Sequence, residues 1–188
     1  MRVLIACEYS GRVREAFRTK GHDAWSCDIL SSEDSSPWHL QTDVLTVLDY
    51  GWDLMIAHPP CTDLAVSGSR WFPEKIADGR QQRALDFVQT LMDARIDKIC
   101  IENPVSVISS KIRKPDQIIQ PWMFGEEYTK TTCLWLKNLP KLEPTEIVGK
   151  GEFVIHGGKK ISKWYSNREF ARDKTFQGIA NAMAEQWG

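Results

Sequence analysis

The stretch RVLIACEYSGRVREAF (residues 2–17) contains, in order, the signals for a strand, a turn and a helix. The apolar run RVLIAC (2–7) has the length of a buried strand, and EYSG (8–11) is a turn sequence. RVREAFRTKGH (12–22) then has the pattern of a helix that ends at Gly21. A strand, a glycine turn and a helix in this order indicate the first unit of an α/β fold.

The rest of the chain repeats this alternation of short apolar runs and helical segments. Further strands are predicted at DAWSCDI (23–29), DLMIA (53–57), KICIENP (98–104) and TTCLWL (131–136), and helices at 78–95 and 175–187. Residues 30–41 are predicted to form a loop, and residues 137–160 loops with a short hairpin. This order predicts an α/β fold with a doubly wound, mostly parallel sheet.

Length and composition limit the class of protein. The chain has 188 residues, of which 42% are hydrophobic and 26% charged, as in ordinary soluble globular proteins. We therefore predict one domain over residues 1–188, with a basic loop and hairpin segment at about 137–172. No apolar run reaches the roughly 18 residues of a membrane span, and the N-terminal run is too short for a secretory signal. These features predict a cytoplasmic protein.

The spacing of cysteines and histidines does not indicate a metal site or a disulfide framework. The five cysteines form no CxxC pair, and no two of the four histidines are four residues apart. Cys27, Cys100 and Cys133 are expected in the core, because free cysteine is commonly buried. We therefore predict that the protein holds no metal.

The charge distribution is uneven along the chain. The formal net charge of −1 does not by itself indicate a nucleic-acid binder. The segment 137–174, however, has nine basic and five acidic residues. Such a local excess suits a surface that holds phosphates and equally suits a solvated face, so both interpretations stay open.

Three residues at successive predicted strand ends suit a nucleoside-containing cofactor. Gly11 at a helix start lets the backbone approach a ligand closely. Asp28 ends the second strand, where a carboxylate accepts hydrogen bonds from ribose hydroxyls, and Asp43 is placed to accept from an adenine amine. No GxxxxGK[ST] phosphate-binding loop occurs, which favours an adenosyl cofactor without phosphates. Taken singly, each acid also suits a helix cap or the surface.

Cys61 follows two prolines in AHPPCTDLAVSG (57–68), and this placement suggests chemistry. The prolines fix the backbone so that the thiol projects from a strand end, and a thiolate is a strong nucleophile. Glu102 ends the next predicted strand, so the two strand ends are expected side by side. A thiol beside a protonatable carboxylate suits attack on a heteroaromatic ring. Taken singly, Cys61 also suits the core and Glu102 the surface.

These motifs together resemble those of a known enzyme family. HPPCTDLAVSG (58–68) with IENP (101–104) resembles the cytosine-5 methyltransferases of DNA, which use S-adenosylmethionine. EYSG resembles the family's cofactor glycine loop, and GIANAMAEQW (178–187) resembles its closing Gly-Asn motif. The motif order extends across nearly the whole chain. The resemblance implies the Rossmann-like fold of S-adenosylmethionine-dependent methyltransferases, and DNA as the partner.

The resemblance also implies roles for single residues. Cys61 would attack carbon 6 of cytosine and Glu102 would contact ring nitrogen 3 and the exocyclic amine, after which carbon 5 takes the methyl group. On duplex DNA the base must first leave the stack. The implied cofactor-binding residues are Glu8, Tyr9, Ser10, Gly11, Asp28, Ile29, Asp43, Pro59 and Asn181. The implied substrate-binding residues are Pro60, Asn103 and Lys130.

The chain departs from the family at several points. Thr62 follows the cysteine where the family usually has Gln, and the loop SGRVRE (10–15) has one glycine where more are usual. Lys130 is expected to replace the cation of the family's arginine-rich stretch. The segment 141–174 is short for the target-recognition region that the family inserts before its closing motif.

Other functions therefore stay open. The same chemistry on RNA or on a free cytosine nucleotide would need less recognition surface. A methyltransferase-like protein that binds DNA or a partner without catalysis is a second alternative. An amino-methyltransferase is disfavoured, because a thiol stands where those enzymes have an aromatic side chain that stacks on the target base.

Overall fold

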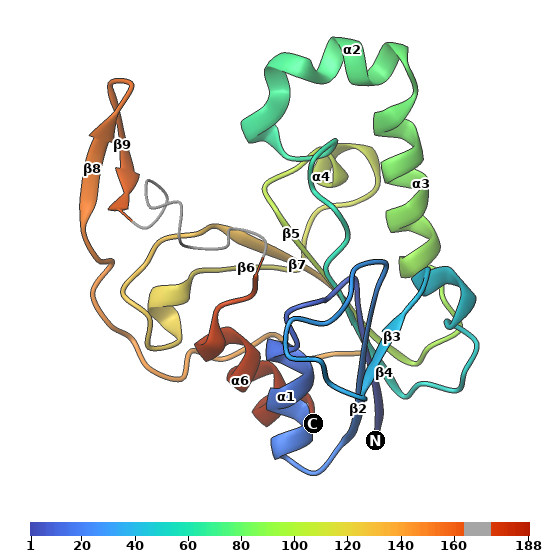
Figure 1. The fold of residues 1–188 in the computed structure, drawn as a ribbon. Coiled ribbons are helices and arrows are strands. Elements are labelled where there is room, and N and C mark those ends of the chain that lie inside the picture. Colours follow the sequence, from blue (N-terminus) through green and yellow to red (C-terminus); the bar gives the residue numbers. More distant parts are fainter. Residues whose placement is uncertain (164–173) are drawn as a thin grey trace.

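The computed structural model describes residues 1–163 and 174–188. Its centre is a seven-stranded sheet with the strand order β3-β2-β1-β4-β5-β7-β6 (Figure 1). The strands are β1 (Arg2–Ala6), β2 (Asp23–Asp28), β3 (His39–Gln41), β4 (Leu54–Ala57), β5 (Lys98–Pro104), β6 (Gln117–Ile119) and β7 (Thr132–Lys137). The part of the predicted basic segment from 164 to 172, with Arg168 and Arg172, lies outside the described residues.

Five neighbouring strands of the sheet run parallel. Strand β1 pairs with β2 on one side and with β4 on the other, β2 pairs with β3, and β4 pairs with β5. Strand β7 is antiparallel to both β5 and β6. The predicted α/β fold with a doubly wound, mostly parallel sheet is therefore confirmed. In such a sheet, the loops that follow β1, β2, β4 and β5 meet at one edge, where ligands bind.

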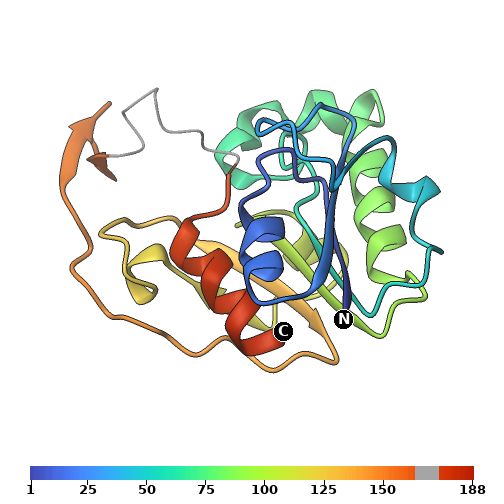
Figure 2. The same ribbon diagram turned by 60° about the horizontal axis from the view of Figure 1, so that its bottom comes forward.

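The central strands are buried on both faces because helices cover both sides of the sheet (Figure 2). Helices α1 (Arg12–Thr19) and α6 (Gln177–Trp187) pack together with Val3 and Ile5 on one face. Helix α3 (Arg80–Met92) packs with Leu4 and Ala6 on the other. Alternate residues of β1 thus enter two different cores, which explains why its sequence is continuously apolar.

The short elements at the edges were not predicted. Strand β3 lies inside the predicted loop 30–41. The sequence had no clear signal for the other short elements, which are β6, α2 (Phe72–Ala77), α4 (Ile108–Lys111) and the 3-10 helices Val44–Thr46, Val66–Trp71 and Pro121–Met123. Strand β3 has three residues and one neighbour, so it needs no apolar run of its own. The expected burial of Cys27, Cys100 and Cys133 is confirmed.

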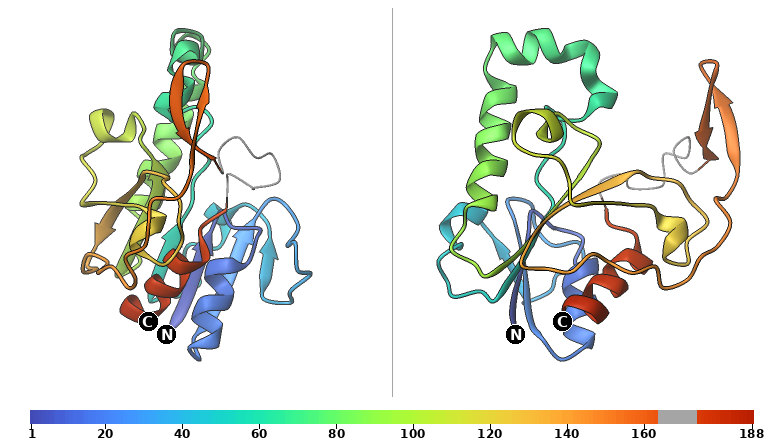
Figure 3. Two further views of the ribbon diagram at one scale, coloured as in Figure 1. Left: turned by 90° about the vertical axis from the view of Figure 1, so that its left-hand side faces the viewer. Right: turned by 180° about the vertical axis from the view of Figure 1, so that it is seen from behind.

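Two elements extend beyond the carboxyl ends of the strands. One is helix α2, and the other is the hairpin of β8 (Phe153–His156) and β9 (Lys159–Ser162), which lies on the opposite side of the molecule (Figures 1 and 3). In the part of the chain that the structure describes, no helix is long and apolar enough to cross a membrane. The single domain over residues 1–188 stays a prediction.

Candidate active site

The segment after β4 and the end of β5 lie together at the carboxyl edge of the sheet. Ala57 pairs with Ile101 in the parallel register, so the residues that follow Ala57 lie beside Glu102 and Asn103. Asn103 is 1% exposed and donates a hydrogen bond from Nδ2 to the carbonyl of Pro59 at 2.8 Å. The structure thus joins the two predicted motifs through a buried contact. Asn103 acts here on the backbone of the Pro-Pro segment, and its contact with a substrate stays a prediction.

His58 holds the carboxyl of Glu102. Its Nδ1 lies 3.1 Å from Glu102 Oε2, and the two side chains are 9% and 13% exposed. The backbone N–H of His58 also donates to the carbonyl of Ala6 at 2.9 Å. Sequence reasoning missed this pairing, because the place of His58 directly after an apolar strand indicates only that it reaches the edge of the sheet, not which side chain it contacts.

Cys61 opens into a cavity of about 550 Å³. Its thiol is exposed, and Pro104 at the end of β5 lines the same cavity. The other walls come from the 3-10 helix Val66–Trp71, the segment Thr129–Thr131 and the β8–β9 hairpin. The cavity therefore lies between the 3-10 helix that precedes α2 and the β8–β9 hairpin, and Lys130 contributes a cation to it. Glu102 itself does not line the cavity.

The charge of Lys130 nevertheless reaches Glu102. Burial raises the pKa of the Glu102 carboxyl, but the hydrogen bond from His58 and the charge of Lys130 outweigh burial, so that this pKa lies below its ordinary value. Without a ligand, Glu102 is therefore ionised at neutral pH. The role that the sequence suggested for Lys130, as the cation beside the target ring, stays a prediction.

Glu8 closes the N-terminal end of helix α1. It is 5% exposed, and its Oε1 accepts from the N–H of Val13 at 2.8 Å and from Ser10 Oγ at 3.3 Å. Its Oε2 accepts from the N–H of Arg14 at 3.3 Å. An acid at this place satisfies the first N–H groups of the helix and opposes its dipole. The geometry supports a capping role for Glu8, and contacts of Glu8 and Ser10 with a cofactor stay predictions.

The structure itself explains why residue 11 is a glycine, without a ligand. Its φ of 74° is left-handed, and a Cβ at this position would collide with the guanidinium of Arg14. Arg14 is fully buried and donates to Ser26 Oγ at 2.8 Å, and it also pairs with Asp34. This buried arginine joins α1 to β2 and to the loop after β2. The left-handed φ and the Arg14 guanidinium both require glycine at this position, and contact of Gly11 with a cofactor stays a prediction.

Asp28, Ile29 and Asp43 lie at neighbouring strand ends. The N–H of Thr42 donates to the carbonyl of Asp28 at 3.0 Å, which joins the ends of β2 and β3. Asp28 accepts from the N–H of Leu30 at 2.9 Å, and Asp43 caps the 3-10 helix Val44–Thr46. Each of the two acids thus accepts a hydrogen bond from the turn that follows it, and their contacts with a cofactor stay predictions. Ile29 is 73% exposed, so an apolar side chain faces solvent beside the two carboxylates.

Cys7 belongs to this group, although the sequence gave it no role. Burial raises the pKa of the Cys7 thiol to about 12, and the charges of Asp28 and Asp43 add to this effect. The thiol therefore stays protonated and lies near both carboxylates. Its φ of 59° is left-handed, which makes it an unusual residue at the turn after β1.

Residues Lys174 and Thr175 connect the glycine loop to the cavity of Cys61. Lys174 Nζ lies 2.5 Å from Glu33 and 5.9 Å from the ring of Tyr9. The carbonyl of Thr175 accepts from Arg12 at 3.0 Å, and that of Lys174 accepts from Lys130 at 3.5 Å. The predicted cofactor loop and the cavity are thus linked through one short segment.

Asn181 lies elsewhere on the described surface. It is exposed on α6, and its Oδ1 accepts from Gln177 Nε2 at 2.9 Å. It lines a groove of about 560 Å³ with Glu15 and Ala16 of α1. The structure does not bring it to the loop Glu8–Gly11 through any described contact. Its cofactor role stays a prediction.

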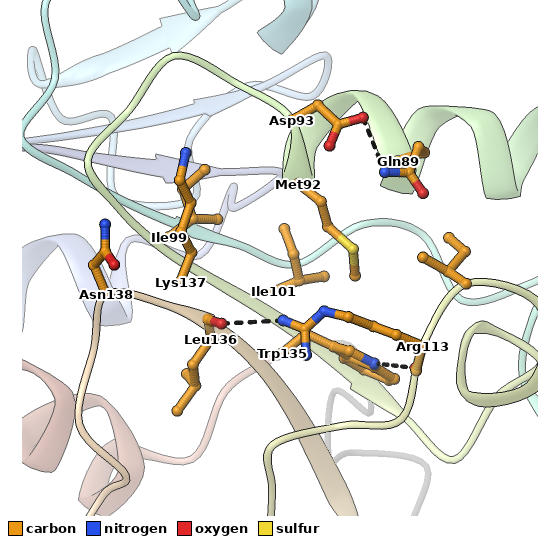
Figure 4. A pocket seen from close by; sticks show the side chains of 11 residues that line it. Gln89, Met92, Asp93, Ile99, Ile101, Arg113, Trp135, Leu136, Lys137 and Asn138 are labelled. Atoms are coloured by element: carbon orange, nitrogen blue, oxygen red, sulfur yellow. Dashed lines mark hydrogen bonds between the residues drawn. The ribbon is translucent and has the colours of Figure 1, made fainter.

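A cavity of about 660 Å³ lies beneath the end of α3 (Figure 4). Its polar side chains already have partners within the protein: Gln89 donates to Asp93, Arg113 to the carbonyl of Leu136, and Lys137 to two backbone carbonyls. No residue of the candidate active site lines it. Among residues 1–163 and 174–188, no group of three or more His, Cys, Asp or Glu side chains could hold a metal ion.

The fold is a mixed α/β fold with a seven-stranded, mostly parallel sheet that has helices on both faces. No protein-family model matches the sequence, and no curated protein matches it. Among solved structures, 35 chains match. One is a prophage-encoded protein (E. coli) described as a proposed DNA modification methyltransferase, with a TM-score of 0.57 and 17% identity. The match covers 79% of this chain and 52% of that one, so this chain spans about half its length. At this identity the likeness shows the fold.

Proposed function

We propose that the protein is an S-adenosylmethionine-dependent methyltransferase that forms 5-methylcytosine in DNA through a covalent adduct on Cys61. One observation carries this proposal. An exposed thiol opens into a cavity shared with Lys130 and with Pro104 at the end of β5, and the same strand end contains Glu102 and is joined to the Pro-Pro segment by the bond from Asn103 to Pro59. A thiol, a cation and a carboxyl at the carboxyl edge of a parallel sheet suit nucleophilic attack on a pyrimidine ring.

The residues after β2 and β3 fit an adenosyl group. Asp28 and Asp43 are acceptors for ribose hydroxyls and for an adenine amine, and the exposed Ile29 offers an apolar surface for the purine. The neutral Cys7 thiol adds no charge between them. S-Adenosylmethionine, when bound here, supplies an electrophilic methyl group. The other residues of the proposed cofactor set are Glu8, Tyr9, Ser10, Gly11, Pro59 and Asn181.

The chemistry of the chain's own residues follows from this arrangement. The Cys61 thiolate forms a bond from Sγ to carbon 6 of cytosine, and Glu102 gives a proton to ring nitrogen 3. Carbon 5 becomes nucleophilic and takes the methyl group. Loss of the carbon 5 proton to solvent, cleavage of the Sγ–C6 bond and return of the nitrogen 3 proton to Glu102 restore the ring. Because the pKa of Glu102 is lowered, the carboxyl must take up its proton as the base binds.

Nucleic acid is the proposed partner because basic side chains surround the cavity. Lys160 of the hairpin lines it, and Lys163 follows β9. Arg70 and the exposed Trp71 lie on the opposite wall element. Cations and an exposed aromatic ring near this cavity suit the binding of phosphates and the stacking of bases. The similarity in fold to a protein described as a DNA modification methyltransferase agrees with this partner.

Transfer of a labelled methyl group tests the proposal. The native protein and Cys61→Ser are incubated with labelled S-adenosylmethionine and, in separate reactions, duplex DNA, single-stranded DNA, RNA and a free cytosine nucleotide. We expect label in 5-methylcytosine of DNA with the native protein and none with Cys61→Ser. Thr62→Ser is the matched control, because Thr62 is the exposed neighbour of Cys61 and should leave transfer unchanged.

Each other outcome has a definite meaning. Label in RNA or in the free nucleotide would keep the chemistry and change the substrate. Retained binding of S-adenosylmethionine and DNA without transfer, unaffected by Cys61→Ser, would indicate a binding protein. Transfer by Cys61→Ser at the native rate would overturn the covalent mechanism.

A further inference from the structure

We propose that His58 is a positioning residue that orients the carboxyl of Glu102 toward the target base. This inference rests on the proposed function. Its basis is the contact between His58 Nδ1 and Glu102 Oε2 at 3.1 Å, in which the side chains are 9% and 13% exposed. Two nearly buried polar groups in contact at the end of neighbouring strands are held in one geometry, because little solvent competes for their hydrogen bond.

The surroundings of the ring indicate which nitrogen has the proton. His58 Nε2 is buried and has no hydrogen-bond partner within residues 1–163 and 174–188. A charged imidazolium would place an N–H donor there without an acceptor, which is unfavourable. The neutral ring with its proton on Nδ1 avoids this. His58 therefore donates from Nδ1 to Glu102 Oε2 and serves as a neutral donor.

This bond leaves one carboxyl oxygen for the substrate. Because Oε2 is held by His58, we assign Oε1 to the contact with a bound base. Two further hydrogen bonds hold the segments on either side of this pair, one from the backbone N–H of His58 to the carbonyl of Ala6 and one from the Asn103 side chain to the carbonyl of Pro59. When Oε1 gives its proton to ring nitrogen 3, the Nδ1–H of His58 stabilises the carboxylate that forms.

Other titratable groups face the pair from the elements packed against it. Lys130, which precedes β7, stabilises the ionised Glu102. The thiols of Cys100 on β5 and Cys133 on β7 have raised pKa values, mainly through burial and partly through the charge of Glu102. Both thiols stay neutral, so Lys130 is the described cation that offsets the charge of Glu102, and His58 adds its hydrogen bond.

Two substitutions separate hydrogen bonding from other effects. The amide nitrogen of Asn in His58→Asn takes the place of Nδ1, whereas His58→Ala removes the donor. The assay is the single-turnover rate of covalent adduct formation with an oligonucleotide that contains 5-fluorocytosine, whose fluorine prevents release of the cysteine. We expect His58→Ala to lower this rate about tenfold or more at its optimal pH, with the affinity for the oligonucleotide unchanged. His58→Asn should recover most of the rate.

The pH profile gives a readout that a purely structural role would not change. Loss of the hydrogen bond raises the pKa of Glu102, so the limb on which the rate falls as Glu102 loses its proton moves to higher pH in His58→Ala. It should stay near the native position in His58→Asn. Native rates and profiles in His58→Ala, or equal loss in both variants, would overturn the inference. If His58→Ala does not fold, His58→Gln replaces it, since its amide reaches the Nε2 position instead.

A second measurement separates this inference from the proposed function. Nitrogen NMR of the ring reports which nitrogen of His58 has the proton, whether or not the protein is active. We expect the proton on Nδ1 in the native protein and a changed signal in Glu102→Gln. A proton on Nε2 would overturn the inference, whereas the absence of any adduct with the native protein would overturn the proposed function.

Discussion

Replacing Glu102 with Gln removes the acidic proton and keeps the shape of the side chain. Glu102→Gln retains an oxygen that accepts from His58 Nδ1, so the contact at 3.1 Å is preserved. It also leaves the register of β4 and β5 and the bond between Asn103 and Pro59 unchanged. The substitution therefore tests the chemistry of the carboxyl with little effect on the fold.

The size of the effect follows from the surroundings of Glu102. The side chain is 13% exposed, so water contributes little to its interaction with a bound base. A hydrogen bond that involves a charged group contributes about 1.5–3 kcal/mol. Loss of that amount from the transition state lowers the rate by about 10-fold to 150-fold. Because the proton transfer to ring nitrogen 3 is also lost, we expect the upper part of this range.

Single-turnover methyl transfer to duplex DNA measures this rate without a contribution from product release. Glu143→Gln is the matched control, because Glu143 is exposed and lies with the C-terminal part of α6 through its bond to Gln186. We expect the control to transfer at the native rate. An unchanged rate in Glu102→Gln would refute the reasoning and remove Glu102 from the mechanism.

Three further predictions follow from the same contacts. Asp43→Ala should weaken binding of S-adenosylmethionine in calorimetry, and equal affinity would contradict its assignment to the adenine amine. Glu8→Gln should lower the free energy of unfolding by about 0.5–2 kcal/mol, because it removes the charge of the cap on α1; an unchanged denaturant midpoint would argue against this cap. Because the pKa of Glu102 is lower in the folded state, its ionisation stabilises the fold above the ordinary pKa of a glutamate, and this stabilisation is lost as the pH falls through the lowered value. Glu102→Gln should therefore lose less stability on acidification than the native protein does, and parallel stability curves would refute this.

The central strands could be predicted from sequence because burial on both faces demands apolar residues. This held for β1, β4 and β5, whose predicted ranges agree with the structure to within a residue or two. Strands β3 and β6 have three residues each at the two edges of the sheet, so no apolar run marks them. Their pairing depends on neighbours that are distant in sequence.

The side-by-side placement of the motifs HPPC (58–61) and IENP (101–104) was also predictable. It needed only that β4 and β5 be neighbours in a parallel sheet, which the register shows. The contact between His58 and Glu102 was not predictable, because it depends on side-chain directions across two strands. The contact between Arg14 and Gly11 was not predictable for the same reason, because it depends on the direction of the Arg14 side chain. Local patterns indicate which residues reach the edge of the sheet, and packing decides what they touch there.

The covalent adduct on Cys61 tests the central claim most directly. The native protein is incubated with S-adenosylmethionine and an oligonucleotide containing 5-fluorocytosine, and the denatured product is digested and analysed by mass spectrometry. The proposed mechanism predicts a peptide that contains Cys61 joined to the nucleotide, with one added methyl group. An adduct on another residue, or none under conditions where both ligands bind, would contradict it.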